Sequence, residues 1–256
     1  MDFFITNISC LGENNDKGYY ERMLNMIGCL IIHGYTGGPH EVEPLAAYLE
    51  ENTDWQIVVP TLPGHGLHLK LENVSYRKWL KAAEASLKKL KQDYDEIYLI
   101  GFSMGGMIAA YLAAKYNVDK LVLLATAGKF LSVKRMILDI GEVVKDGIRG
   151  NLHKNHHYVR LKRKLGKVPM QANIEFLKLV RFTRNYLKDV KTPVLIAQGQ
   201  QDSLVPVRAA SYLDNQISST EKKVVLFEKS DHQICLGEDK DVLNSMVLNF
   251  LLTETD

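Results

Sequence analysis

Short apolar runs alternate with helical patterns along most of this chain. The runs cover 27–33, 55–59, 96–100, 120–125, 193–198 and 223–227, and apolar residues recur at helical spacing over 39–51, 76–92, 104–116, 206–216 and 239–252. Strands that alternate with helices are typical of a parallel sheet with right-handed crossovers and helices on both faces. The chain therefore predicts an α/β fold.

One segment, 129–191, interrupts this alternation. Its pattern indicates two or three helices and no strand, and it contains 16 Lys and Arg against five Asp and Glu. We therefore expect a core of 1–128 and 192–256 and a small helical cap of 129–191 over the carboxyl edge of the sheet. The cap's charge is interpreted first as solvated helix faces; attraction of anionic substrates or transient contact with an anionic lipid surface is the alternative.

The overall composition argues against several classes of protein. The net charge of +2 is too small to indicate binding to nucleic acid. Cys10, Cys29 and Cys235 have neither the number nor the spacing of a disulfide framework or a zinc site, so we expect a cytoplasmic location and no metal. We expect no signal peptide and no membrane-spanning segment, since no suitable apolar run is present.

The turn at Ser103 carries the clearest chemical signal. The apolar run 96–100 leads directly into Gly-Phe-Ser-Met-Gly-Gly at 101–106, and an alanine-rich helical pattern follows without a gap. A turn this tight between a strand and a helix forces the serine into a strained conformation and exposes its hydroxyl at the helix N-terminus. The pattern predicts that Ser103 is a nucleophile.

A serine hydroxyl needs a base, and the base needs a group that orients it. His232 follows the run 223–227, and no other histidine occurs after residue 157. Asp202 follows the run 193–198, at the same predicted edge of the sheet. We expect His232 to be the general base and Asp202 to be its orienting acid. Asp231 is the alternative acid, disfavoured because it adjoins His232.

The tetrahedral intermediate of acyl transfer needs hydrogen-bond donors for its negative oxygen. One expected donor is the backbone N–H of Met104, the residue after the nucleophile. The glycine-rich stretch 33–38, which follows the first predicted strand, allows backbone donors to approach a substrate. We assign the second donor to the N–H of Tyr35. His65, in a nearby turn, is expected to pack that turn.

At these motifs the sequence resembles the carboxylesterase and monoacylglycerol lipase branch of the α/β-hydrolases, especially small bacterial cytosolic carboxylesterases. The matching pieces are LIIHGYTGGP, VVPTLPGHG, LIGFSMGG, TPVLIAQGQQDSLVP and FEKSDHQI. The resemblance implies a mostly parallel sheet of about six to eight strands, the triad Ser103, Asp202 and His232, and no cofactor. Because only about 26 residues precede the first strand, six or seven strands are expected here.

The leading interpretation is a carboxylic-ester hydrolase that forms an acyl-enzyme on short- to medium-chain esters. Its substrate pocket is expected to include Tyr35, Met104, Met136, Ile140 and Phe176, partly from the apolar side chains of the cap. A thioesterase, an amidase, an acyltransferase or a hydrolase of carbon–carbon bonds would use the same triad. A non-catalytic binding module on the same fold is the alternative from a different class.

Overall fold

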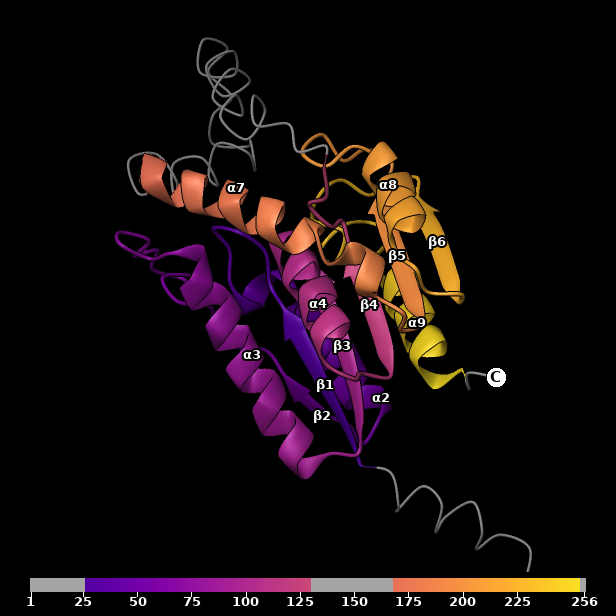
Figure 1. The fold of residues 1–256 in the computed structure, drawn as a ribbon. Helices are drawn as coiled ribbons and strands as arrows, with labels where there is room; N and C mark the ends of the chain where they lie inside the picture. Colours follow the sequence, from indigo (N-terminus) through magenta and orange to yellow (C-terminus); the bar gives the residue numbers. More distant parts are fainter. Residues whose placement is uncertain (1–25, 130–167, 254–256) are drawn as a thin grey trace, which may run out of the picture.

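The computed structural model describes residues 26–129 and 168–253, and within them a single sheet organises the molecule (Figure 1). Six strands lie in the order β2-β1-β3-β4-β5-β6. They are β1 (Ile27–Ile32), β2 (Gln56–Val58), β3 (Glu96–Phe102), β4 (Lys120–Leu124), β5 (Val194–Gly199) and β6 (Lys222–Phe227). Every neighbouring pair is parallel. The predicted α/β fold with a parallel sheet is therefore confirmed, at six strands in the described part.

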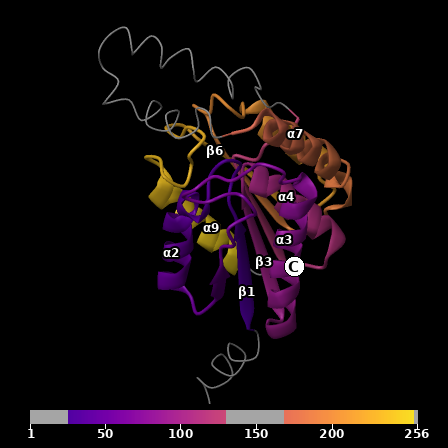
Figure 2. The same ribbon diagram turned by 90° about the vertical axis from the view of Figure 1, so that its left-hand side faces the viewer.

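Helices cover both faces of the sheet, as the turned view in Figure 2 shows. The α-helices are α2 (Glu43–Asn52), α3 (Tyr76–Asp93), α4 (Met104–Lys115), α7 (Met170–Arg184), α8 (Arg208–Gln216) and α9 (Lys240–Leu252), with 3-10 turns η1 (Pro39–Glu41) and η3 (Leu187–Asp189). Alternate residues of β1 point to opposite faces: Leu30 and Ile32 pack in the core beneath α3 and α4, and Cys29 and Ile31 in the core beneath α2 and α9.

The strand order reverses between β1 and β3. β2 pairs with one edge of β1 and β3 with the other, with Ile32 opposite Gly101 at the carboxyl end. The chain therefore leaves β1 and β3 at the same carboxyl edge of the sheet. After β1 it continues to β2 on one side, and after β3 it continues to β4 on the other side. A crevice at such a reversal is where open α/β sheets bind ligands.

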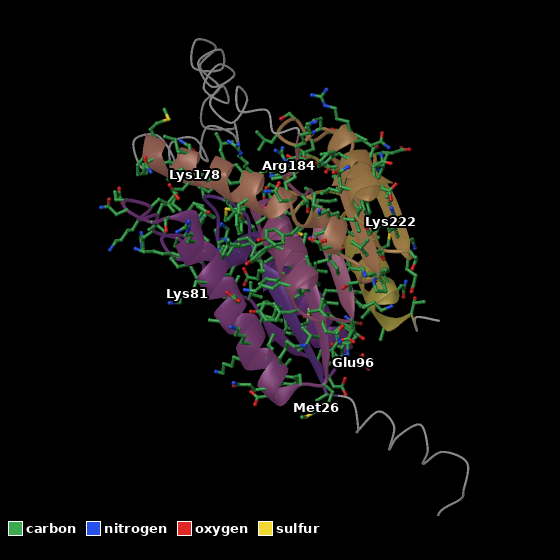
Figure 3. All side chains as sticks on the ribbon, viewed as in Figure 1. Met26, Lys81, Glu96, Lys178, Arg184 and Lys222 are labelled. Carbon is green, nitrogen blue, oxygen red and sulfur yellow. The ribbon has the colours of Figure 1, made fainter. Side chains whose placement is uncertain are left out.

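Helix α7 belongs to the predicted cap and lies beyond the carboxyl ends of the strands. In Figure 3, Lys178 and Arg184 of α7 lie at the end of the molecule opposite Met26 and Glu96, which mark where β1 and β3 begin. Phe176, with other apolar residues of α7, is buried against α3 and α4. Residues 130–167 of the predicted cap lie outside the described residues, so the limits 129–191 stay a prediction.

A buried carboxylate fixes α7 to the core. Oε2 of Glu175 accepts the backbone N–H of Tyr76 at 3.0 Å, where α3 begins. The other oxygen of this carboxylate, Oε1, accepts hydrogen bonds from Gln171 and Lys178 of α7 itself. One side chain of α7 thus satisfies an N–H that the first turn of α3 leaves without a partner inside that helix.

Candidate active site

Ser103 lies in the strained turn that the sequence predicts. β3 ends at Phe102, α4 begins at Met104, and Ser103 between them has φ 54° and ψ −113°. A positive φ is costly for a residue with a Cβ atom and persists only where the surroundings enforce it. Those surroundings are hydrogen bonds to the end of β4 and the loop after it: Ser103 N donates to Leu124 O at 2.8 Å, and Ala127 N donates to Ser103 O at 3.2 Å.

Two glycines of the turn are required by close contacts between backbones. A Cβ atom on Gly101 would overlap the carbonyl of Gly105, and one on Gly105 would overlap the carbonyl of Ile32 at the end of β1. The backbone of the first turn of α4 is therefore in close contact with the end of β1. This contact brings the loop that follows β1 next to the N-terminus of α4, where Ser103 lies.

A continuous chain of hydrogen bonds joins the three side chains predicted to form the triad. Nε2 of His232 lies 2.9 Å from Oγ of Ser103, and Nδ1 of His232 lies 2.7 Å from Oδ2 of Asp202. The residues follow β3, β5 and β6 and are exposed by only 6–9%. With a carboxylate as acceptor, Nδ1 carries the proton and Nε2 is left to accept from the serine hydroxyl.

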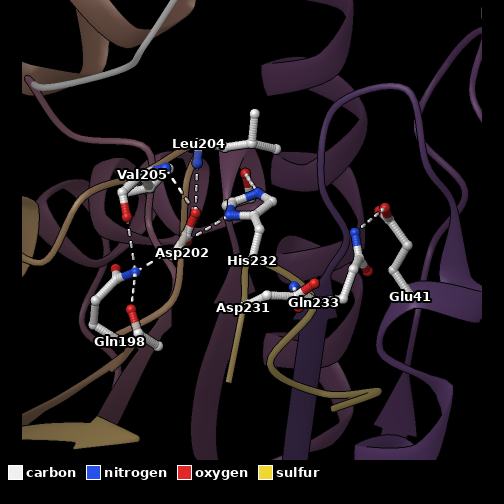
Figure 4. Close-up of polar contacts among 10 residues, drawn as sticks. Glu41, Gln198, Asp202, Leu204, Val205, Asp231, His232 and Gln233 are labelled. Atoms are coloured by element: carbon white, nitrogen blue, oxygen red, sulfur yellow. Dashed lines mark hydrogen bonds and ion pairs between the residues drawn. The ribbon is translucent and has the colours of Figure 1, made fainter. Parts of the chain in front are cut away.

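The structure gives Asp231 a different position from Asp202. Its Oδ1 accepts the backbone N–H of Gln233 at 2.8 Å, and its side chain is exposed. Asp202 instead is buried, and its Oδ1 accepts the N–H groups of Leu204 and Val205, both at 2.8 Å (Figure 4). The geometry therefore supports Asp202 as the partner of His232.

The two predicted oxyanion donors start from the same edge of the sheet. Neither the N–H of Tyr35 nor that of Met104 has a hydrogen-bond acceptor among the residues that the structure describes. Since α4 contacts the end of β1, both free donors belong to adjoining turns beside Ser103. Free N–H groups near a nucleophile can bind a developing oxyanion.

His33 holds the glycine-rich loop through both ring nitrogens. The N–H of Leu62 donates to Nε2 at 3.1 Å, so Nδ1 carries the ring proton and donates to the carbonyl of Gly34 at 2.9 Å. Burial lowers the pKa of His33 to about 3, which keeps the ring neutral. A second bond, from Gly66 N to Gly37 O at 2.9 Å, ties the loop to the same turn.

His65 lies in that turn, as expected, and is buried. Its Nδ1 lies 3.1 Å from the carbonyl of Pro63, and its ring contacts those of His33 and Trp79 at centroid separations of 5.3 Å. Burial lowers the pKa of His65 to about 4. The contacts support the predicted packing role.

Glu41 holds the glycine-rich loop after β1 through a hydrogen bond, and nothing in the sequence pattern indicated this role. Its buried Oε2 accepts the N–H of Gly34 at 3.1 Å, and Oε1 lies 3.5 Å from Nε2 of Gln233, the residue after His232 (Figure 4). A Cβ atom on Gly37 would overlap this carboxylate. One buried acid thus contacts both the loop of Tyr35 and the loop of His232.

The remaining predicted pocket residues are divided between described and undescribed parts of the chain. The side chain of Tyr35 points to α7, where its Oη donates to Oδ1 of Asn173 at 3.1 Å and its ring stacks on Phe176. Phe176 is 2% exposed, and Met104 is fully buried. Met136 and Ile140 lie outside the described residues. The pocket therefore stays a prediction.

Within residues 26–129 and 168–253, no group of three or more His, Cys, Asp or Glu side chains is arranged to hold a metal ion. No helix in these ranges has the length and apolar character needed to cross a membrane.

The fold, a matching family model and two bacterial relatives together define an α/β-hydrolase of the esterase and lipase class. A solved structure from the metagenome-derived lipolytic enzymes LipS and LipT superposes with a TM-score of 0.72 at 21% identity, covering 89% of this chain and 94% of that one. A family model described as serine aminopeptidase, S33, matches residues 28–240. The chain belongs to this family.

Two bacterial relatives match almost the whole chain. Identity to the thermostable monoacylglycerol lipase of Bacillus sp. (strain H-257) is 30% over 229 residues, which cover 88% of this chain and 90% of that protein. Identity to the carboxylesterase of Bacillus subtilis (strain 168) is 22% over 224 residues, covering 87% and 91%. The resemblance at the motifs is therefore confirmed along nearly the full length of the chain.

Proposed function

We propose that this protein hydrolyses carboxylic esters through an acyl-enzyme formed on Ser103. The observation that carries the proposal is the hydrogen-bonded chain from Oγ of Ser103 through His232 to Oδ2 of Asp202. It ends at a strained turn beside two free backbone donors. This is the arrangement that nucleophilic acyl transfer requires.

In acylation, Oγ of Ser103 attacks the carbonyl carbon of the ester while Nε2 of His232 takes the hydroxyl proton. Asp202 accepts from Nδ1–H and stabilises the imidazolium that forms. The carbonyl oxygen becomes an oxyanion and accepts hydrogen bonds from the N–H groups of Tyr35 and Met104. When the intermediate collapses, His232 returns the proton to the alkoxy oxygen, the ester C–O bond breaks and the alcohol leaves.

Deacylation repeats the sequence with water as the nucleophile. His232 takes a proton from water as its oxygen attacks the acyl carbon, and the same two backbone donors bind the second oxyanion. Collapse then breaks the bond to Oγ of Ser103, which regains its proton from His232. The products are a carboxylic acid, an alcohol and the original enzyme.

Short- to medium-chain monoesters, including monoacylglycerols, are the proposed substrates. Support comes from the relatives, one of which is a monoacylglycerol lipase and the other a carboxylesterase. Phe176 and Tyr35 place aromatic surface of α7 and of the oxyanion loop side by side. With Met104 and the cap residues Met136 and Ile140, they are the residues we propose to line the acyl pocket.

The family description, serine aminopeptidase, favours one specific alternative, hydrolysis of an amide bond next to an amino terminus. Two relatives that match almost the whole chain are a monoacylglycerol lipase and a carboxylesterase. Ester hydrolysis therefore stays the leading proposal. Thioesters, acyl transfer and carbon–carbon bonds would engage the same triad.

Labelling with a fluorophosphonate tests the proposal directly. The purified protein should bind the probe covalently at Ser103, Ser103→Ala should not, and Ser86→Ala on α3 serves as a matched control that labels normally. Turnover of p-nitrophenyl butyrate, a butyryl thioester and leucine p-nitroanilide then ranks ester, thioester and amide. A folded wild-type protein that neither labels nor turns over any of these would be a binding module; faster turnover of the anilide would favour the peptidase.

A further inference from the structure

Gln198 is a buried polar residue that contacts Asp202 of the proposed triad. It is the second-last residue of β5, in the apolar run Val-Leu-Ile-Ala-Gln-Gly, and is 1% exposed. An amide in the interior of a sheet is costly unless its polar atoms are paired. Its partners therefore indicate why a glutamine is tolerated at this position.

The amide nitrogen of Gln198 faces three oxygens. Nε2 lies 3.0 Å from Val205 O, 3.0 Å from Oδ2 of Asp202 and 3.3 Å from Gly199 O (Figure 4). Two of these oxygens are carbonyls and the third is a carboxylate, so all three only accept. An amide oxygen in the same place would face acceptors alone, so the surroundings fix the orientation of the amide. Gln198 is thus held as a donor to Asp202.

The oxygen that accepts from Gln198 is the one that accepts from the base. Oδ2 of Asp202 lies 2.7 Å from Nδ1 of His232 and 3.0 Å from Nε2 of Gln198. Oδ1 accepts the backbone N–H groups of Leu204 and Val205. Each carboxylate oxygen therefore has two donors. Rotation of the carboxylate about its Cβ–Cγ bond would break all four hydrogen bonds at once.

We propose that Gln198 is a positioning residue that holds the Asp202 carboxylate in the plane in which Oδ2 receives the Nδ1 proton of His232. The inference rests on the proposed function and extends it by one residue. With the carboxylate fixed, His232 keeps the tautomer whose Nε2 can take the proton of Ser103. The hydrogen bonds of Gln198 go to Asp202, Val205 and Gly199 and not to Ser103, so it acts through Asp202.

A purely structural role is the alternative, because Gln198 also ties together Val205 O and Gly199 O. Two substitutions separate the roles. Gln198→Met keeps the length of the side chain and removes the donor. Gln198→Glu keeps the shape and, when ionised, places a like charge against Asp202. Gln201→Met is the matched control, since Gln201 is an exposed neighbour whose Nε2 donates to Glu228 O at 3.0 Å.

The measurements are kcat and KM for p-nitrophenyl butyrate across pH, with the melting temperature of each variant. Gln198→Met should lower kcat by about 10- to 100-fold, as expected for loss of one hydrogen bond to a charged group, with KM changed by less than about threefold. Gln201→Met should match the wild type. A folded Gln198→Met that keeps more than half of wild-type kcat would overturn the proposal.

Gln198→Glu gives a readout that a structural role would not produce. The like charge of Asp202 favours protonation of the introduced carboxyl, and in that state it donates as the amide does. Its kcat relative to the wild type should therefore rise as the pH is lowered from 8 to 6. A ratio that stays constant and well below one over this range would contradict the positioning role, even if Gln198→Met fails to fold.

A double-mutant cycle identifies the residue through which Gln198 acts. In an Asp202→Asn background, Gln198→Met should cost less than about threefold further, because the carboxylate that it positions is gone. A full independent loss would mean that Gln198 acts elsewhere. Failure of the proposed function is distinguishable, since the wild type would then not react with the fluorophosphonate; normal labelling with wild-type kinetics in every Gln198 variant would overturn only this inference.

Discussion

The ring of Tyr35 stacks on the ring of Phe176 with centroids 4.6 Å apart and planes within 4° of parallel. Tyr35 belongs to the loop that carries a proposed oxyanion donor, and Phe176 belongs to α7 of the predicted cap. The hydroxyl of Tyr35 also donates to Asn173 of α7. The side chain of Tyr35 therefore connects the cap to the loop, whereas its proposed chemical role uses only the backbone N–H.

This division of roles predicts the effect of Tyr35→Ala. Loss of the stack should lower the free energy of unfolding by about 1–3 kcal/mol. kcat should fall by less than about 100-fold, because the N–H of residue 35 survives the substitution. Urea unfolding and steady-state kinetics check both parts, with Tyr48→Ala on α2 as the control. A loss of four orders of magnitude in a folded variant would mean that the phenol takes part in the chemistry.

Substitutions in the proposed triad should separate the two candidate acids. Ser103→Ala or His232→Ala should lower kcat by about 10⁵- to 10⁶-fold, and Asp202→Asn by about 10⁴-fold. Asp231→Asn should change kcat by less than about threefold, because that side chain is exposed and bonds the N–H of Gln233. If Asp231→Asn is the more damaging substitution, Asp202 is the wrong acid.

Stability should fall on acidification because two histidines are buried in the neutral form. Burial lowers the pKa of His33 to about 3 and of His65 to about 4, below the ordinary value of about 6.5. Below that ordinary value the unfolded chain binds more protons than the folded one, so this stabilisation is complete above pH 6.5 and is lost as the pH falls towards 4.

Urea unfolding at pH 7.5, 6 and 5 measures this loss of stability. Each histidine contributes at most about 1.4 kcal/mol to the loss per pH unit. His65→Phe should flatten the pH dependence by up to one proton. His68→Asn, in the same turn but exposed, should leave the slope unchanged. Equal slopes in wild type and His65→Phe would show that His65 does not contribute.

Acyl-chain length should reveal the size of the pocket. A small cap should enclose about six to ten carbons at about 0.8 kcal/mol per buried methylene, so kcat/KM should rise with chain length and then fall. p-Nitrophenyl esters from C2 to C16 measure the optimum, and Phe176→Leu tests whether this residue lines the pocket. A maximum at C14–C16, or strong activity on emulsified triglyceride, would contradict a small pocket.

Contact of the cap with anionic lipid stays a prediction, and α7 supplies residues to test it. Met170, Ile174 and Leu177 are exposed at helical spacing, by 68%, 42% and 39%, beside the exposed Lys178 and Arg181. Sedimentation with phosphatidylglycerol vesicles should be stronger at low than at high salt. Ile174→Glu should weaken it, and Val242→Glu on α9 should not. Binding that is absent, or equal for phosphatidylcholine vesicles, would leave the charge as solvated surface.

The sequence was sufficient for the sheet and for the turn at Ser103, because both depend on local patterns. Apolar periodicity marks each strand, and glycine spacing marks the turn at Ser103, whose φ is positive. Asp202 and His232 were predictable because parallel strands bring their carboxyl ends to one edge of the sheet.

Glu41 and Gln198 were not predictable, because their roles depend on distant partners. Glu41 has the local pattern of any acid near a helix start, yet its carboxylate reaches Gln233, 192 residues further along the chain. In the sequence, Gln198 is only a polar residue near the end of an apolar run. Its contacts with Asp202 and Val205 exist because the loop after β5 folds back next to it. Burial of a single polar group is decided by tertiary packing, which periodicity does not record.

The parallel strand order has a consequence for biosynthesis. The turn at Ser103 leaves the ribosome before His232, which lies 129 residues further along the chain in the loop after β6. Domains emerge from their N-terminus, and parallel strands wait for distant partners before they pair. A nascent chain that stalls between residues 103 and 232 therefore carries a nucleophile with no base, and turnover becomes a reporter of translation that has passed His232.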